Sequence, residues 1–368
     1  MKPISIISLI LIAAIVIGTG IALAHKFNPV VSAQPSVLIS TQQATNATGI
    51  PGFSLVVWAQ VNNFSQLLNH YLNNGGNFEN SNYAMYMSAL PNITQSYFEV
   101  LKHNSTTFIL GAVLATNSSI NFNKIESLLV LLLNFNTSTY QSMNYAYGNV
   151  SFYGIALGYV NKTLFFSLVN GTSNNIKSAV SIIKDEYNTL KANHWKVPPV
   201  PSKLTTIPYM SLTAWGYLNF SAINLTFPSL SEMNFFGHHN YIYVLSNQDP
   251  HHHGFWRQNK IFKIIKSLNA TSMYIGYYTN STLHSVLATI KAINETAVNE
   301  TFTIAEAFAI NYTTGTYDGA QYLISHMNNS SILYAIDRHY IIIESFNEYV
   351  NNQFMLSVLG NELGVLGL

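Results

Sequence analysis

The chain has no cysteine and few charged residues. Its 368 residues include no Cys, and Asp, Glu, Lys and Arg together make up 8%, where about 25% is usual. The missing thiols exclude a disulfide framework, a lipid attached to an N-terminal cysteine and a metal site with thiolate ligands. A formal net charge of +1 provides no basic surface, so we expect no nucleic-acid partner.

Familiar catalytic motifs are also missing. The sequence contains no GxSxG, no HExxH, no P-loop and no dinucleotide-binding fingerprint. A glycosidase needs two carboxylates across a cleft, but the acidic residues are scattered and suggest no such pair. Asp185 and Glu186, for example, are expected at a solvated helix end. We therefore disfavour an enzyme, leave the question open, and nominate no catalytic residue.

Neutral polar residues take the place of the missing charges. The chain is 48% hydrophobic and 13% aromatic, which is enough to form packed cores, and it is rich in Asn, Ser, Thr and Tyr. A surface of neutral groups changes little in charge when the pH falls, whereas paired carboxylates lose their effect as they protonate. The composition is typical of a protein that faces an acidic medium, and a biased genome composition is the alternative explanation.

One long apolar segment lies near the start of the chain. Residues 4–24 carry no charge, with Lys2 before them and Lys26 after them. This run meets the ~20 residues that span a bilayer and exceeds the ~7–15 of a signal-peptide core. We expect residues 1–26 to be a signal anchor that makes the membrane a partner. The alternative is a signal peptide cleaved after Ala24 or Ala33. In both cases the rest of the chain is exported.

Asn-X-Ser/Thr sequons are frequent and support export. The sequence contains 18 of them, more than its composition gives by chance, and such asparagines accept glycans only outside the cytoplasm. The leading candidates for glycosylation are Asn104, Asn117, Asn161, Asn269 and Asn280. Two pairs among the sequons, 104 with 269 and 117 with 280, are interpreted as repeats of each other.

Two sequence blocks recur in the same order. Residues 50–58 (IPGFSLVVW) return as 207–215 (IPYMSLTAW), and residues 104–111 are matched to 269–276. Such repetition indicates a duplicated unit. The proline-rich residues 196–203 read as an extended linker. We therefore expect a first repeat at 27–195 and a second at 204–368, with a His-rich insertion at about 227–262.

Strands and helices alternate within each expected repeat. We predict an α+β fold of two tandem related domains, each a mainly antiparallel sheet with helices packed on one face, behind the N-terminal transmembrane or signal helix. Predicted helices include 122–133, 175–190, 283–293, 317–326 and 352–359. Predicted strands include 53–61, 108–115, 153–158, 164–169, 210–218, 273–279, 303–310, 332–336 and 340–345.

A histidine-rich loop and a tyrosine pair are the candidate binding residues. The loop contains His238, His239, His251, His252 and His253, and imidazole binds Zn and Cu. Adjacent histidines cannot all reach one ion, so a solvated, pH-sensitive loop is favoured over a Zn or Cu site, and no other cofactor is expected.

The tyrosine pair is Tyr274 and Tyr278, which the strand period places on one face. These two rings are candidates for contact with a sugar or a partner peptide, and core packing is the simpler interpretation.

These features together predict an extracellular-facing envelope glycoprotein of the cell membrane with a non-enzymatic binding or structural role. An envelope protein or a glycan is the expected partner. The alternatives are a solute-binding protein and a secreted hydrolase without a recognisable motif. In composition, sequons and N-terminal segment the chain resembles surface proteins of acid-living archaea.

Overall fold

The computed structural model describes residues 37–62, 93–117, 122–195, 204–222, 268–327 and 330–368. The chain divides into two compact units. Unit 1 contains residues 1–200 with 222–228, and unit 2 contains residues 201–221 with 229–368. The predicted anchor at 1–26, the linker at 196–203 and the insertion at 227–262 lie outside the described residues.

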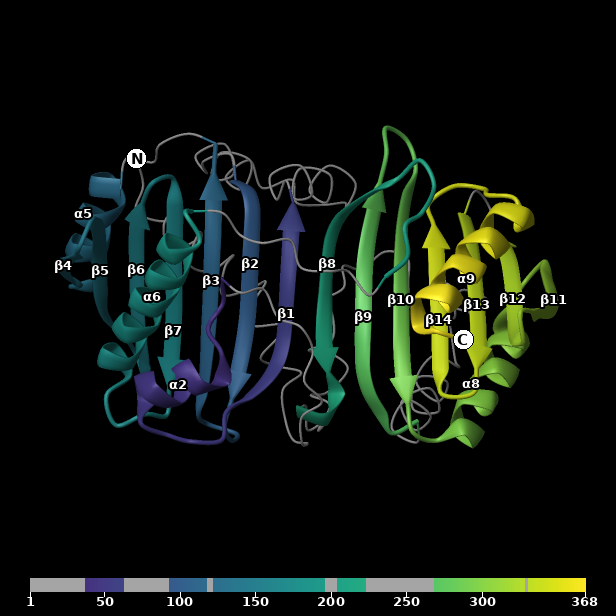
Figure 1. Ribbon diagram of the computed structural model, residues 1–368, viewed down its shortest axis with the longest axis horizontal. Coiled ribbons are helices and arrows are strands. Elements are labelled where there is room, and N and C mark those ends of the chain that lie inside the picture. Colours follow the sequence, from purple (N-terminus) through teal and green to yellow (C-terminus); the bar gives the residue numbers. More distant parts are fainter. Residues whose placement is uncertain (1–36, 63–92, 118–121, 196–203, 223–267, 328–329) are drawn as a thin grey trace, which may run out of the picture. The chain divides into compact units, whose positions relative to one another are not determined.

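Unit 1 is built around an antiparallel sheet with order β1-β2-β3-β7-β6-β5-β4. Its elements are α2 (Thr41–Thr48), β1 (Ser54–Asn62), β2 (Ile93–Lys102), β3 (Phe108–Thr116), α5 (Phe122–Leu133), β4 (Asn136–Tyr140), β5 (Met143–Val150), β6 (Tyr153–Val160), β7 (Thr163–Asn170) and α6 (Asn175–Ala192). Figure 1 shows α6 across one face of the sheet, next to α2.

The helices α5 and α6 pack on opposite faces of this sheet. Leu110 and Ala112 of β3 share a core cluster with Phe122 and Leu129 of α5. Side chains alternate along a strand, so the residues between them face α6. On that second face, the Ser167 hydroxyl of β7 donates to the Ala179 carbonyl of α6 at 2.9 Å.

Unit 2 contains a second antiparallel sheet with order β8-β9-β10-β14-β13-β12-β11. Its elements are β8 (Ser211–Asn219), the 3-10 turn η1 (Phe220–Ala222), β9 (Ala270–Thr279), β10 (His284–Ala292), α8 (Glu295–Phe308), β11 (Tyr312–Tyr317), β12 (Ala320–Met327), β13 (Ser330–Asp337), β14 (Tyr340–Phe346) and α9 (Asn352–Leu366). The fourteen described strands thus run in the same succession, and in the same sheet order, in the two units.

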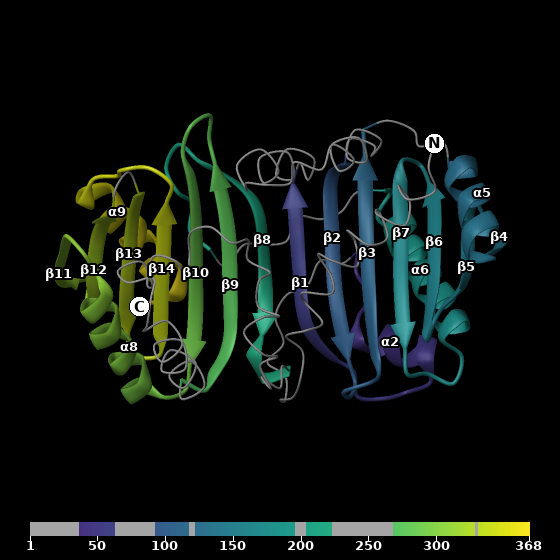
Figure 2. The same cartoon turned by 180° about the vertical axis from the view of Figure 1, so that it is seen from behind.

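Unit 2 also has a helix on each face of its sheet. Met355 and Val358 of α9 pack against Leu287 and Ile342, whereas the α8 side of the sheet has a separate cluster. The view from behind in Figure 2 brings α8 to the front of the sheet, while α9 is in front in Figure 1.

The predicted α+β fold with helices on one face is therefore wrong. Among the described residues, 48% lie in strands and 27% in helices, so the fold is mainly antiparallel sheet, and each sheet has helices on both of its faces. Helices cover both faces of the inner strands, so these strands have apolar residues at consecutive positions. Without an alternation of apolar and polar residues, the sequence does not show how many faces are covered. The predicted N-terminal helix belongs to residues that the structure does not describe.

Local predictions succeeded where the pattern was strong. The helix at 122–133 is confirmed as α5. Asparagines cap the starts of α6 and α9: Asn174 accepts from the Lys177 N–H, and Asn351 accepts from the Phe354 N–H.

The predicted helix at 283–293 is wrong, because this segment is strand β10, paired with β9 on one side and β14 on the other. The predicted strand at 303–310 lies largely in α8, and the predicted helix at 317–326 is mainly β12.

None of the helices among the described residues combines the length and the apolar character needed to cross a bilayer.

Candidate functional site

Unit 1 contains two glutamates that meet inside the protein. Glu99 of β2 is 1% exposed and Glu186 of α6 is 0% exposed. Both lie over Gly111 of β3, where an added Cβ would be 2.9 Å from the Oε1 atom of each carboxyl. The glycine therefore leaves the space that the two carboxyl groups occupy.

This carboxyl pair has few compensating contacts. The Ile39 N–H donates to Glu99 Oε1 at 3.0 Å, whereas neither carboxyl oxygen of Glu186 has a hydrogen-bond partner among the described residues. Burial raises the pKa of both groups well above the ordinary value, and the nearby charges of Glu99 and Asp185 raise the pKa of Glu186 further. Two close carboxyls in a dry site cannot both ionise without a large cost, so the protonated form of the pair is favoured.

Unit 2 contains a second pair of buried glutamates. Glu344 of β14 and Glu362 of α9 are each 0% exposed. The Thr289 hydroxyl and the Thr205 N–H donate to Glu362, at 2.6 and 2.8 Å. The Ser285 hydroxyl donates to Glu344 at 3.3 Å.

Burial also dominates the ionisation of this second pair. It raises the pKa of Glu344 well above its usual value, with a further increase from the neighbouring Glu362 charge and a decrease from the Ser285 hydrogen bond. The pKa of Glu362 is raised less, because its two hydrogen bonds favour the charged form. Solvent does not reach these four carboxyls, so in this conformation they cannot act directly on a dissolved substrate.

The sequence pattern of α6 contained a signal for this arrangement that we missed. Glu186 was expected at a solvated helix end, which is wrong. It follows Ala179, Ile182 and Ile183 at helical spacing, and all three are buried. A carboxyl on an apolar stripe is buried with that stripe, and Glu362 similarly lies beside Leu359 and Leu363 in α9.

The turns that carry sequons form the other candidate site. Asn104 lies between β2 and β3, and its Oδ1 accepts from the N–H groups of Thr106 and Thr107 at 2.9 and 2.8 Å. Asn280 lies between β9 and β10, and its Oδ1 accepts from Thr282 and Leu283 at 2.9 and 2.7 Å. The same Asn-Ser-Thr triplet therefore makes the same turn in both units.

The positions of the sequons in the two units show that the sequon pairs inferred from the sequence are wrong. Asn104 corresponds to Asn280 rather than to Asn269, which precedes β9 and has no place in the β9–β10 turn. Asn117 follows the third strand of unit 1, as Asn294 does in unit 2. The error arose because residues 108–111 of β3 were matched to residues of β9, although β9 holds the sheet position of β2.

Most sequon asparagines of the described residues face solvent. Asn104, Asn117, Asn161 and Asn269 are exposed, and Asn280 is partly exposed. Asn219 differs, since it is 1% exposed at the end of β8. The remaining exposed ones are Asn46, Asn136, Asn149, Asn294, Asn299 and Asn311.

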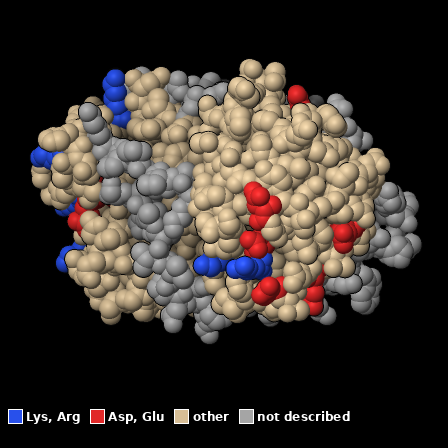
Figure 3. All heavy atoms as spheres, turned by 45° about the vertical axis from the view of Figure 1, so that its right-hand side comes forward, with Lys and Arg blue, Asp and Glu red and all other residues tan. Residues whose placement is uncertain are grey.

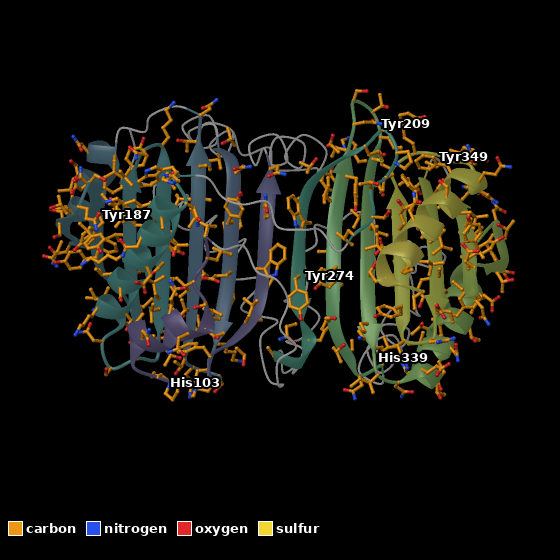
Figure 4. The ribbon with its side chains drawn as sticks, viewed as in Figure 1. His103, Tyr187, Tyr209, Tyr274, His339 and Tyr349 are labelled. Atoms are coloured by element: carbon orange, nitrogen blue, oxygen red, sulfur yellow. The ribbon has the colours of Figure 1, made fainter. Side chains whose placement is uncertain are left out.

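The two candidate tyrosines lie on one face of β9, as the strand period predicts, and face the core. Tyr278 is 1% exposed and its hydroxyl donates to the Thr205 carbonyl at 2.7 Å. Tyr274 is partly buried against the same core cluster, with its ring centroid 5.0 Å from that of Tyr217. Figure 4 labels Tyr274 beside the strands of unit 2. Burial leaves Tyr278 out of reach of a surface ligand.

The five histidines of the predicted metal loop lie outside the described residues. Within the described ranges, no cluster of three or more His, Asp or Glu side chains is arranged to hold a metal ion. Figure 3 shows the acidic and basic side chains as small separate groups on a surface that is mostly neither.

Comparisons with known proteins give little to build on. No protein-family model matches the chain, and no curated protein sequence matches it. Among solved structures, crystal form III of TP0453 is similar at 11% identity and a TM-score of 0.37, covering 89% of this chain and 98% of that chain. Crystal form I is similar at 10% identity and a TM-score of 0.35, covering 88% and 98%. TM-scores this low carry no argument about this chain.

Proposed function

We propose that this chain is an exported glycoprotein, held at the cell membrane by residues 4–24, with a non-enzymatic binding or structural role in the envelope. The observation that carries the proposal is the recurrence of sequons at matching, solvent-facing places of the two units. Asn104 with Asn280, and Asn117 with Asn294, are the clearest of these matches.

Turn geometry alone does not account for the recurring triplets. An asparagine that accepts two backbone N–H groups is a good turn former with almost any residue two positions later. In both turns that later residue is a threonine, Thr106 and Thr282, which is what an N-glycosylation acceptor requires. Selection for the acceptor site explains a hydroxyl residue in both turns. In unit 1 the Thr106 hydroxyl also donates to Asn104 Oδ1 at 3.1 Å, so that turn gives a second reason for its threonine.

The distribution of charge supports an exposed position in an acidic medium. The surface is poor in ionised groups, so glycans would supply solvation that charged side chains supply in other proteins. The four buried carboxyls favour their protonated form, which is the form that dominates at low pH. The partner would then be an envelope protein or a glycan contacted through neutral polar groups.

Cell fractionation tests this proposal. The full chain is expected in the membrane fraction, resistant to a carbonate wash and cut by protease added to intact cells. A variant without residues 1–26 is expected in the cytosol, protected from the protease and free of glycan. Recovery of the full chain in the cytosol, or protection of it in intact cells, would contradict the proposal.

A further inference from the structure

Each unit ends in a strand with an open edge. β4 pairs with β5 and β11 pairs with β12, and each is last in the strand order of its unit. Within the described residues neither strand has a partner strand on its other side, and Figures 1 and 2 agree in this. Most residues of both strands are exposed. Such an edge offers backbone N–H and C=O groups with which another strand can pair.

These edges lack the usual protection against pairing. β4 has the sequence NTSTY and β11 has YTTGTY, with no charged residue and no proline. Thr and Tyr favour extended backbone. Lys184 comes near β4, but its ammonium lies 5.0 Å from the Tyr140 ring centroid, over the ring face. A neutral edge of this kind is a template for association between chains.

A sequon marks the start of both edge strands. Asn136 is the first residue of β4 and begins Asn-Thr-Ser, and Asn311 directly precedes β11 and begins Asn-Tyr-Thr. Both asparagines are exposed. Along the chain, β4 follows β3 and α5 in unit 1, and β11 follows β10 and α8 in unit 2. The two edge strands therefore hold the same position in their units. The acceptor site is therefore placed beside the open edge in both units.

We propose, on the basis of the glycosylation proposed above, that glycans on Asn136 and Asn311 cap these two edges and prevent copies of the chain from pairing edge to edge. A pairing strand must come within about 4.8 Å of the edge. A glycan bonded to Nδ2 at the start of the edge strand is bulky and would hinder that approach. In a chain with so few charges, the glycan takes the place of the lysine that commonly protects an edge.

The test removes the two acceptors and measures assembly. Asn136→Gln with Asn311→Gln is compared with the wild-type glycoprotein and with Asn299→Gln, which removes an exposed sequon of α8. Size-exclusion chromatography with light scattering is expected to give the double variant at least about twice the molar mass of the wild type, rising with concentration. The Asn299→Gln control is expected to keep the wild-type mass.

A rescue and a second variant make the result specific. Adding Thr137→Lys and Thr314→Lys to the double variant is expected to restore the wild-type mass, because a charge on the edge blocks pairing. Ser138→Ala with Thr313→Ala removes the same two acceptors while both asparagines stay, and is expected to assemble as well. If circular dichroism shows that the glutamine variant does not fold, this alanine variant takes its place in the test.

The possible failures are distinguishable. Glycans found at other sequons but absent from both edge asparagines would overturn this inference and leave the proposed function standing. Absence of glycan from every sequon would overturn both. If the edge asparagines carry glycan and their removal leaves the mass unchanged, or if the lysines fail to reverse assembly, edge capping is wrong.

Discussion

Replacing Glu186 by glutamine should change how stability depends on pH. Glu186 is fully buried next to Glu99, and its pKa is raised well above 4.5 by burial and by neighbouring negative charge. In the unfolded chain this carboxyl loses its proton near pH 4.5, whereas in the folded protein it keeps it. The stabilising contribution of the neutral group is thus fully present below about pH 4.5 and is lost as the pH rises toward the folded pKa.

The size of the effect follows from proton linkage. One proton retained only by the folded state lowers the free energy of unfolding by about 1.4 kcal/mol for each pH unit. This loss accumulates with each pH unit above 4.5 through which only the folded state keeps the proton. Glutamine has no proton to lose. The free energy of unfolding of Glu186→Gln should therefore fall less steeply with pH than that of the wild type, by this amount for each pH unit.

Denaturant unfolding at pH 4 to 7, followed by tryptophan fluorescence, measures this difference. The matched control is Glu300→Gln, the same change on an exposed side chain of α8, which reports the effect of the substitution itself. Equal slopes for the wild type and Glu186→Gln would refute the reasoning, because they would mean that Glu186 ionises alike in the folded and unfolded chain.

Three further substitutions test contacts in the two cores. Gly111→Ala adds a methyl group 2.9 Å from two buried carboxyl oxygens and should cost about 1–3 kcal/mol in the free energy of unfolding; a neutral result would mean that the carboxyls are placed elsewhere. Thr289→Val removes the 2.6 Å hydrogen bond to Glu362 and should lower the melting temperature, with a cost of about 1–3 kcal/mol. Tyr278→Phe removes the hydrogen bond to the Thr205 carbonyl and should lower the free energy of unfolding by about 1 kcal/mol. The far-ultraviolet circular dichroism should not change, and a gain in stability would contradict that hydrogen bond.

The sequence predicted single elements better than it predicted their layers. Helix α5 has the predicted bounds of 122–133, because its apolar residues recur at helical spacing. The helix predicted at 283–293 is β10, in which buried and partly buried residues alternate. Its buried face holds the polar Ser285 and Thr289 beside Leu287, so the sequence does not show the apolar alternation by which a strand is recognised.

The buried carboxyls show a different limit of sequence reasoning. Glu186 has an acidic neighbour, Asp185, and such pairs usually lie in solvent. Its burial depends on Gly111, whose missing side chain makes room for the carboxyl from a strand far away in the sequence. The apolar stripe of α6 signals that Glu186 is buried, but its meeting with Glu99 over Gly111 depends on how β2, β3 and α6 pack together and is not visible in local spacing. An Asn-Ser-Thr triplet is a local turn signal, but its place between two strands was predicted in neither unit, because β2 was missed and β10 was predicted as a helix.

Glycopeptide mass spectrometry of the native protein, purified from the membrane fraction, tests the central claim most directly. The account predicts glycan on exposed or partly exposed sequon asparagines at matching places of both units, with Asn104 and Asn280 first among them. It also predicts that Asn219, buried at the end of β8, is unmodified. A native protein whose Asn104 and Asn280 peptides are both unmodified would contradict it.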